Sequence, residues 1–270
     1  MRAEKKSDIL LNRSVWIIEI DNNFDSPSTF TLLLSKMSEA LLPDTKGNHI
    51  GEGGTFDDFI QKQKGVKFII NGGFNHYRKN FYEWKHQEFN VGNPVGITKI
   101  RNHYFEDILT LDNYGFFIQN NKKDPWKIVK YDDLNKNEKY ILGCTPLLIF
   151  NGKKEELPRE MNPVEKGKIN PPSMLGHGMQ NHPRTAVGLK DNKIVFIIVE
   201  GLKNNGGCTL KELQEIGLKL ELDSLLNLDG GGSSQFRFKT NSGWISNEID
   251  EEDKDRVLGH VIVLFDETLK

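Results

Sequence analysis

The chain has 270 residues, of which 37% are hydrophobic and 27% are charged, and its formal net charge is -2. This length suits one large domain, and the balanced charge argues against a nucleic-acid partner. No stretch approaches the ~20 apolar residues of a membrane-spanning helix, and the polar start has no signal-peptide core. We therefore expect no membrane partner and a cytoplasmic location, with action outside the cell after release as the alternative. The sequence does not predict an oligomeric state.

In chain order, apolar and alternating runs predict strands separated by short turns. The expected strands cover residues 15–21, 30–34, 66–70, 95–97, 114–118, 140–150, 186–189, 194–199, 222–228, 235–238 and 257–265. Pro146, inside the run 140–150, favours an edge position or a bulge there. Two helices are expected, at residues 55–60 and 209–220, and the second opens with a capping box of Thr209 and Glu212.

These elements predict the α+β fold class, as a single domain with a mixed, largely antiparallel β-sheet core flanked by a few helices. The domain is expected to cover residues 15–265, with polar tails at 1–14 and 266–270. Cys144 and Cys208 have no metal or redox spacing, so we expect reduced thiols in the core.

Three longer segments interrupt the regular pattern. A glycine-punctuated loop covers residues 39–54. Aromatic and basic residues fill positions 76–90, which form either a lid facing a sugar or half-buried packing. A proline-rich stretch covers residues 153–180, and a loop of that length is usually functional or partly disordered.

The most distinctive stretch is a glycine loop, Asn227-Leu228-Asp229-Gly230-Gly231-Gly232-Ser233-Ser234. Consecutive glycines suit a tight turn or the close approach of a ligand to bare backbone amides. Asp229 before the glycines and the two hydroxyls after them would surround those amides with polar groups. The alternative is a flexible linker or an ordinary turn, which would normally lack the strand-like flanks found here.

Polar residues occur at the ends of four apolar runs: Asn71, Arg184-Thr185, Glu200 and Asp229. Strand ends hold side chains rigidly while loops expose them, so ligand sites gather there. Arg184 would clamp a phosphate or carboxylate beside an anion nest of glycine amides. Glu200 and Asp229 would supply the two carboxylates that glycosyl chemistry uses. The alternatives are a structural salt bridge for Arg184 and a plain hairpin turn at Asn71-Gly72-Gly73.

Other site types find little support in the sequence. It has neither a Gly-x-x-x-x-Gly-Lys phosphate loop nor a Gly-x-Ser-x-Gly nucleophile elbow. His177 and His182 are five residues apart in a loop, which is weak support for a metal site.

The ordered motifs resemble those of the phosphodiester glycosidase family. They are Asn71-Gly72-Gly73-Phe74, His182-Pro183-Arg184-Thr185-Ala186-Val187-Gly188, Glu200-Gly201, Thr209-Leu210-x-Glu212-Leu213 and the glycine loop, spread over residues 15 to 265. The resemblance implies hydrolysis of a sugar-1-phosphodiester, such as an N-acetylglucosamine compound, to free sugar and a phosphomonoester. Cell-wall polymers and nucleotide sugars carry such linkages, and a phage origin would fit this chain.

Three residues receive catalytic roles from the resemblance: Asp229, Glu200 and Arg184. One carboxylate would be the nucleophile or the base that activates water, and the other would orient the sugar or supply a proton. Arg184, the hydroxyls of Ser233 and Ser234, and the glycine amides of the loop would take the phosphate. The residues implied to line the cleft with them are Asn71, Gly72, Gly73, His182, Thr185, Asn227, Gly230, Gly231, Gly232, Ser233 and Ser234.

No cofactor is required by this chemistry, and the alternative is a divalent ion between Asp229 and phosphate. The chain departs from the family pattern twice, with Leu202 where an Arg is usual and Asn75 where a second Phe is usual. These departures leave open the sugar, and they favour the rival expectation of a non-catalytic carbohydrate- or phosphate-binding module.

Overall fold

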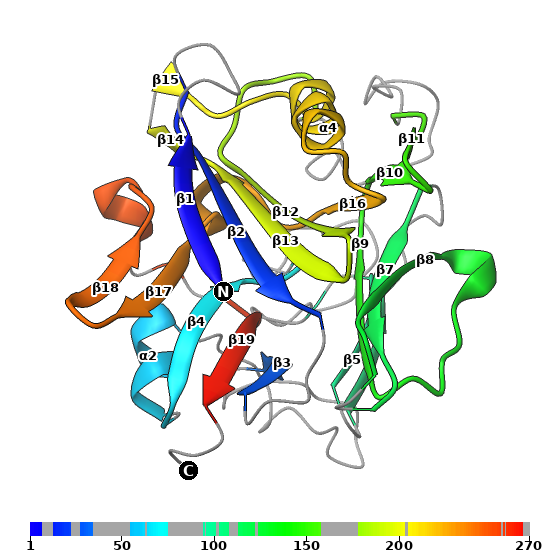
Figure 1. Cartoon of the computed structure of the whole chain (residues 1–270), viewed down its shortest axis with the longest axis horizontal. Helices are drawn as coiled ribbons and strands as arrows, with labels where there is room; N and C mark the ends of the chain where they lie inside the picture. The colour runs from blue at the N-terminus through cyan, green and yellow to red at the C-terminus, as the bar shows by residue number, and fades with distance from the viewer. Residues whose placement is uncertain are drawn as a thin grey trace, which may run out of the picture.

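The computed structural model describes residues 1–6, 13–22, 28–34, 55–62, 64–74, 94, 96–100, 103–107, 113–121, 124–157, 178–202, 205–254, 256 and 258–266. These residues form three larger β-sheets, one small two-stranded sheet and two α-helices (Figure 1). Every strand pairing among them is antiparallel. The expected antiparallel β core with few helices is therefore confirmed, although the described part of the chain contains no parallel pair that would make a sheet mixed.

The seven-stranded sheet contains the longest hairpin of the chain. Its strand order is β1 (Arg2–Lys6), β2 (Val15–Asp21), β13 (Lys193–Val199), β12 (Arg184–Lys190), β16 (Ser224–Asn227), β10 (Leu147–Phe150) and β11 (Lys153–Lys154). Asp191 and Asn192 form the two-residue turn between β12 and β13, and both have positive φ. Asn and Asp tolerate that conformation, which matches the twist of the two strands.

Two five-stranded sheets complete the framework. One has the order β18 (Gly243–Ser246), β17 (Phe236–Thr240), β4 (Val66–Asn71), β19 (His260–Asp266) and β3 (Ser28–Leu34). The other has the order β6 (His103–Asp107), β5 (Gly96–Ile100), β9 (Tyr140–Cys144), β7 (Gly115–Gln119) and β8 (Lys127–Lys130). The small sheet pairs β14 (Gly201–Leu202) with β15 (Asn205–Gly206). Short 3₁₀ turns lie at η2 (Tyr131–Asp133), η3 (Gly231–Ser233) and η4 (Glu251–Asp253).

One apolar cluster joins the three larger sheets. Phe196 of the seven-stranded sheet, Phe68 of the second sheet and Phe117 of the third belong to it, and all three are fully buried. Phe68 and Phe196 lie 5.4 Å apart between ring centroids. Burial of large rings is the main favourable term in folding, so this cluster fixes how the sheets meet.

Helix α4 (Leu210–Lys219) covers the other face of the seven-stranded sheet (Figure 1). Leu213 and Ile216 are fully buried there against residues such as Ile197 of β13. The expected capping box is confirmed, because Glu212 N donates to Thr209 Oγ1 and Thr209 N donates to Glu212 Oε2. The first helix, α2 (Phe56–Lys62), begins just after Thr55, whose hydroxyl accepts from Asp58 N.

Two sequence expectations need correction. The run 140–150 is two strands in different sheets, β9 and β10, because the chain turns at the cis Thr145–Pro146 peptide. Pro146 thus marks a break between sheets, and the expected bulge lies directly after it, where the pairing of β10 with β16 shifts register between Leu147 and Ile149. Residues 1–14 were expected to be a polar tail, yet Arg2–Lys6 pair with β2 as strand β1.

Several expectations lie partly or wholly outside the described residues. The loop at 39–54 and the aromatic stretch at 76–90 lie outside the described residues. The proline-rich stretch is described only at 153–157 and 178–180. No helix of the described part is long and apolar enough to cross a membrane.

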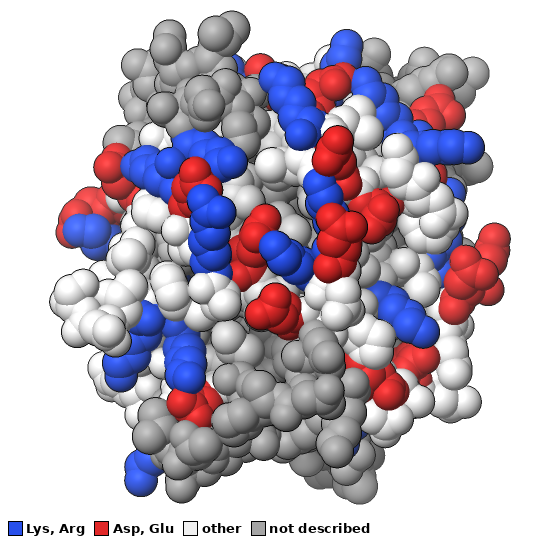
Figure 2. All heavy atoms as spheres, in the orientation of Figure 1, with Lys and Arg blue, Asp and Glu red and all other residues white. Residues whose placement is uncertain are grey.

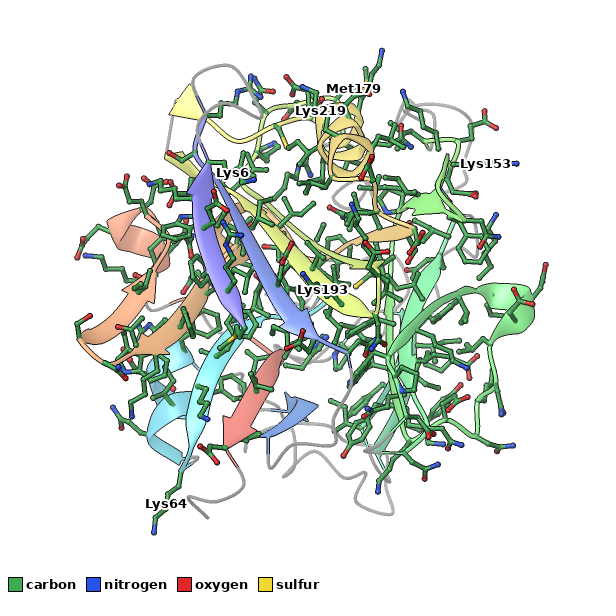
Figure 3. The ribbon with its side chains drawn as sticks, viewed as in Figure 1. Lys6, Lys64, Lys153, Met179, Lys193 and Lys219 are labelled. Atoms are coloured by element: carbon green, nitrogen blue, oxygen red, sulfur yellow. The ribbon has the colours of Figure 1, made fainter. Side chains whose placement is uncertain are left out.

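The visible surface mixes both signs of charge. Lys and Arg alternate with Asp and Glu on the face drawn in Figure 2, in keeping with the net charge of -2. Lys64 and Lys153 extend outward at the rim of the molecule in Figure 3. Cys144 and Cys208 are both buried, unpaired thiols, as expected.

Candidate active site

The glycine loop lies where two sheets meet. Asn227 pairs with Ala186, so the end of β16 lies beside the start of β12, and Leu228 N donates to Thr185 O at 2.9 Å. Asp229 N in turn donates to Gly72 O, just after β4 of the second sheet, at 3.3 Å. Strand β4 pairs with β17 and β19, so its end is no hairpin turn. The strand ends at Asn71, Thr185 and Asp229 are therefore neighbours in space.

Asn71 is the buried hub of this junction. Its Nδ2 donates to Asp229 O at 2.8 Å and to Gly72 O at 3.2 Å. Its Oδ1 accepts from Thr185 Oγ1 at 2.9 Å and from Gln235 N at 3.3 Å. An amide has two donor hydrogens and two acceptor lone pairs, so these bonds use the whole side chain. Asn71 and Thr185 thus position the loop.

Asp229 is the most perturbed carboxyl of the site. Its side chain is buried, and burial raises its pKa to about 7. A hydrogen bond from Ser233, the charge of Arg256 and the bond from Gly230 N, 2.9 Å from Oδ1, act in the opposite direction. A carboxyl with a pKa near 7 exists in both protonation states at neutral pH, which suits acid–base catalysis.

The backbone of the glycine loop is turned toward the protein. Gly231 N donates to Pro183 O at 2.9 Å, and Gly230 N donates to Asp229. Ser233 N and Ser234 N close the 3₁₀ turn on carbonyls of the loop itself. The expectation of an open anion nest is therefore wrong for Gly230 and Gly231, because their amides already have acceptors. Gly231 has a φ of 59°, in the left-handed region that favours glycine.

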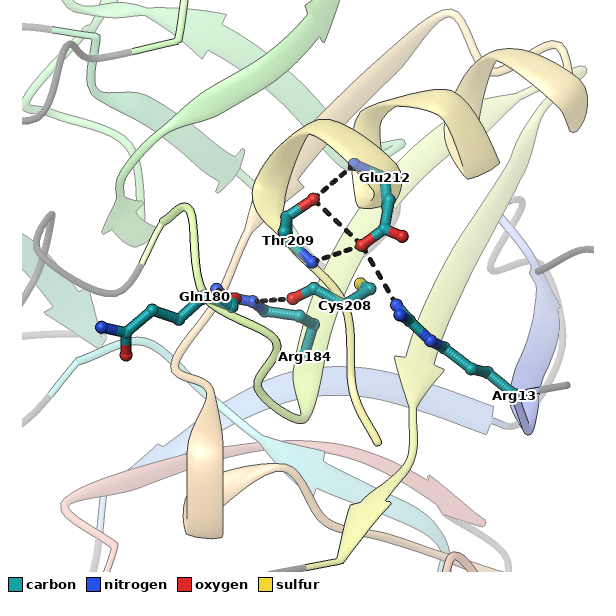
Figure 4. Close-up of polar contacts among 6 residues, drawn as sticks. All are labelled: Arg13, Gln180, Arg184, Cys208, Thr209 and Glu212. Atoms are coloured by element: carbon teal, nitrogen blue, oxygen red, sulfur yellow. Dashed lines mark hydrogen bonds and ion pairs between the residues drawn. The ribbon is translucent and has the colours of Figure 1, made fainter. Parts of the chain in front are cut away.

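Arg184 lies against this loop. It is 6% exposed, its Nε donates to Cys208 O at 2.9 Å, and its Nη2 donates to Gln180 O at 3.0 Å (Figure 4). A methyl group added to Gly230 would come within 3.9 Å of Arg184 Nη1. The two carbonyls orient the guanidinium without neutralising its charge, and burial lowers its pKa. The geometry suits an anion clamp beside Asp229.

His182 shapes the approach to Arg184. His182 and Cys208 form a β-bridge, and Cys208 N donates to His182 O at 2.8 Å. The His182 ring is half-buried, with Nε2 3.1 Å from Gln180 Oε1. His177 lies outside the described residues. Within the described ranges, no group of three or more His, Cys, Asp or Glu side chains could hold a metal ion.

Glu200 has a structural environment. Its Oε1 accepts from Trp16 Nε1 at 2.7 Å and from Glu248 N at 2.9 Å, while Lys5 Nζ lies 2.8 Å from Oε2. Both oxygens are therefore engaged, in a side chain that is 7% exposed. The two carboxylates paired in the sequence have different surroundings, and Asp229 is the one placed in the glycine loop.

Asn227 and Ser234 are buried on either side of Asp229. Asn227 Nδ2 donates to Thr145 O at 2.9 Å. Asn227 Oδ1 and Ser234 Oγ have no hydrogen-bond partner among the described residues. Buried polar atoms are normally satisfied, so a water or a ligand group is expected at each of them.

His260 belongs to this site although the sequence did not single it out. Gly73 N donates to its Nε2 at 2.9 Å, and Gly72 N donates to its backbone oxygen at 3.2 Å. A methyl group on Gly72 would lie 2.5 Å from the His260 ring, which explains the glycine there. Burial lowers the pKa of His260 to about 4. Its signal was a lone polar residue in an apolar closing strand.

Gln235, Asp253 and Arg256 were missed as well. Gln235 follows the two serines directly, and its Nε2 bridges Gly232 O at 3.1 Å and Asp253 O at 2.8 Å. Asp253 and Arg256 lie in a charged stretch that looks like ordinary solvated surface in the sequence.

The chain belongs to the phosphodiester glycosidase family, whose model matches residues 64–265. This finding confirms the family that the ordered motifs resemble. No curated protein matches the chain in sequence.

Solved structures share the fold at low sequence identity. The zebrafish N-acetylglucosamine-1-phosphodiester alpha-N-acetylglucosaminidase catalytic domain, auto-inhibited by its pro-peptide, matches with a TM-score of 0.63 and 15% identity, over 98% of this chain and 81% of that one. A hypothetical protein from Synechocystis matches with a TM-score of 0.55 and 12% identity, over 94% of this chain and 59% of that one. A putative exported protein from Burkholderia pseudomallei matches with a TM-score of 0.56 and 12% identity, over 94% and 74% of the two chains.

Proposed function

We propose that this chain is a glycosidase that hydrolyses the glycosidic bond of a sugar-1-phosphodiester, with N-acetylglucosamine as the first sugar to test. The observation that carries the proposal is the buried carboxyl of Asp229, whose pKa is raised to about 7, in a glycine loop that the guanidinium of Arg184 approaches at Gly230. Membership of the phosphodiester glycosidase family and the fold shared with the zebrafish enzyme support the same reaction class.

In the proposed reaction, water adds to the anomeric carbon as the bond from that carbon to the phosphate oxygen breaks. The electron pair of the broken bond stays on the phosphate, which leaves as a monoester. Asp229 in its charged form takes the proton from the water, and Arg184 stabilises the charge that develops on the phosphate. Glu200 holds the surrounding strands, because both of its oxygens are engaged by the protein.

The test is incubation with a panel of sugar-1-phosphodiesters, including UDP-N-acetylglucosamine and methyl-phospho-N-acetylglucosamine, with detection of free sugar. Asp229→Asn should lower kcat by roughly 10²- to 10⁴-fold, the range typical of a lost general base. Asp223→Asn is the matched control, because Asp223 is exposed and follows Leu222 just before β16. Unchanged turnover in Asp229→Asn would remove Asp229 from the mechanism.

The anomeric form of the first product identifies the step that Asp229 performs. Direct attack by activated water inverts the configuration, whereas a covalent sugar–Asp229 intermediate retains it. NMR of the product at early times distinguishes the two outcomes. Arg184→Ala should lower kcat/KM in either case, and an unaffected kcat/KM would exclude the clamp.

A second candidate function is a non-catalytic module that binds carbohydrate or phosphate on the same fold. The three protein contacts of Glu200 favour this alternative. They occupy both oxygens of Glu200, so Asp229 is the single catalytic acid that the pair of carboxylates provides. Binding of sugar phosphates without turnover of any member of the panel would support this alternative.

A further inference from the structure

A short segment near the end of the chain is fastened over the glycine loop. It comprises residues 250–254 and Arg256 and contains the turn η4. Asp253 N donates to Asp250 O at 3.0 Å, and Arg256 N donates to Asp253 O at 3.1 Å. The buried Gln235 side chain ties Asp253 O to Gly232 O. The segment is therefore held by the same loop that carries Asp229.

The Asp253 carboxylate rests directly on Gly232. A methyl group added to Gly232 would lie only 2.1 Å from Asp253 Oδ1 and 2.4 Å from Oδ2. No real pair of such atoms comes that close, so a glycine is required at this position for the acid to approach. The third glycine of the loop thus makes room for a protein side chain.

Asp253 in turn holds Arg256. The Nη1 of Arg256 donates to Asp253 Oδ1 at 2.8 Å. The Arg256 side chain is 32% exposed, whereas the Asp253 side chain is 17% exposed. The positive charge of Arg256 favours the charged form of the Asp229 carboxyl. The carboxylate of Asp253 therefore orients a guanidinium that is near Asp229 and also reaches solvent.

We propose that Arg256, oriented by Asp253, is a further contact for the phosphate of the substrate and acts together with Arg184. This inference rests on the proposed function. A phosphate brought beside a charged Asp229 meets a like charge, and a nearby guanidinium offsets that repulsion while donating hydrogen bonds to the phosphate. Arg184 approaches the loop at Gly230, whereas Arg256 is held by Asp253, whose carboxylate lies against Gly232, so the two cations are placed at different residues of the loop.

The first experiment measures the binding of inorganic phosphate by calorimetry at pH 8 and low salt, using the full chain. Arg256→Gln should weaken binding roughly 10-fold or more, as expected for a lost charge-assisted hydrogen bond. Arg256→Lys should restore part of the affinity, because it keeps the charge and loses the planar fork. Lys254→Gln is the matched control, since Lys254 lies in the same segment and pairs with exposed Glu251. It should bind phosphate within about 2-fold of the parent chain.

Each outcome decides the inference. Equal phosphate affinity in Arg256→Gln and Lys254→Gln would overturn it, and so would an absence of phosphate binding by the parent chain. If Arg256→Gln fails to fold, Asp253→Asn provides the second variant. This variant keeps the arginine and removes the charge that orients it. Its phosphate affinity should therefore fall below that of Lys254→Gln, by less than the roughly 10-fold expected for loss of Arg256.

A pH profile separates this role from a merely structural one. Loss of the Arg256 charge should move the acid limb of kcat/KM to higher pH, because Asp229 then loses its proton less readily. Lys254→Gln should leave the limb in place. The phosphate titration needs no turnover, so a chain that binds phosphate through Arg256 and hydrolyses nothing would refute the proposed reaction and leave this inference standing.

Discussion

At the scale of single residues, two buried groups of opposite kind lie around Gly72 and Gly73. Burial raises the pKa of the Asp229 carboxyl to about 7 and lowers the pKa of the His260 imidazole to about 4. Both shifts favour the neutral form, because an uncompensated charge is costly away from water. The neutral imidazole must keep an acceptor lone pair on Nε2 to receive the proton of Gly73 N, so the second ring nitrogen carries the hydrogen.

Asp229 should make the chain less stable as pH rises. The unfolded carboxyl has a pKa near 4, so between about pH 4 and 7 the folded state binds more protons than the unfolded state. The free energy of unfolding therefore falls through that window. Asp229→Asn removes this loss and should be more stable than the parent at pH 8, by an amount on the order of 2–4 kcal/mol, with the difference vanishing near pH 4.

Urea unfolding of both chains at pH 4 and pH 8 measures this difference. Asp223→Asn, at an exposed position, should show no comparable change between the two pH values. A difference between Asp229→Asn and the parent that is the same at both pH values would contradict the shifted pKa.

His260→Leu tests the support beneath the two glycines. The substitution replaces the imidazole with an apolar side chain of similar size and leaves the buried Gly73 N without its acceptor, which should cost about 1–3 kcal/mol of unfolding free energy. Because Asp229 N is bonded to Gly72 O, turnover should fall as well. His260→Gln offers an acceptor oxygen and should recover part of both losses. Equal stability of the two variants would show that the Gly73 bond contributes little.

At the scale of elements, the stretch that precedes α4 connects helix capping to the anion clamp. Thr209 caps the helix with Glu212, and Arg13 Nη1 also donates to Glu212 Oε2 at 3.0 Å (Figure 4). The residue before the cap, Cys208, accepts from Arg184 Nε through its backbone oxygen. The start of the helix therefore helps to place the guanidinium.

Gly207→Ala should disturb this arrangement strongly. Gly207 has a φ of 77°, and an added methyl group would lie 2.0 Å from the backbone carbon of His182. Because backbone atoms cannot move aside alone, the His182–Cys208 bridge must open and carry the Arg184 acceptor with it. We expect a loss of more than about 2 kcal/mol of unfolding free energy and a raised KM.

Gly152→Ala is the control for that substitution. Gly152 also has positive φ, at 70°, but nothing lies within 4 Å of an added methyl group. Its cost should be limited to backbone strain of about 1 kcal/mol, without a change in KM. Thermal unfolding and steady-state kinetics of both variants measure the contrast. Similar changes in stability and in KM for the two variants would mean that the His182–Cys208 bridge does not hold Arg184.

At the scale of the whole molecule, strand β1 is attached to the site region through Glu200. Lys5 of β1 lies 2.8 Å from Glu200 Oε2 and 3.7 Å from Glu248 Oε1. Hydrogen bonding to Glu200 raises the pKa of Lys5. The first residues of the chain thereby meet the segment that leads, through Glu248, to η4 and Arg256.

Lys5→Met should lower stability by less than about 1 kcal/mol, because the lysine is more than a third exposed and water screens its charge. The effect should shrink further at high salt. Lys6→Met is the control, since Lys6 lies 3.9 Å from Glu4 on the same strand and does not reach Glu200. Urea unfolding of Lys5→Met and Lys6→Met at low and at high salt measures both effects. A larger loss of stability in Lys6→Met than in Lys5→Met would contradict a stabilising Lys5–Glu200 ion pair.

The sequence by itself determined the local elements whose signals lie within a few neighbouring residues. Three kinds of feature depend only on neighbours in the chain and can be predicted without the fold: alternating runs, the turn Asp191-Asn192 and the Thr209 capping box. The glycine loop and Arg184 could be singled out as candidates for the same reason. The end of the strand at Thr145–Pro146 was not, because the change of sheet depends on which strands lie alongside.

Only the tertiary structure decided what each polar residue does. Glu200 and Asp229 look equivalent in the sequence, yet one is bonded to Lys5 and Trp16 and the other is desolvated within the glycine loop. His260 and Arg256 reach the site from the last part of the chain, 26 and 22 residues beyond Ser234, where the glycine loop ends. Burial and charge proximity join residues that are far apart in sequence, and these two quantities set a carboxyl's pKa and an arginine's partner.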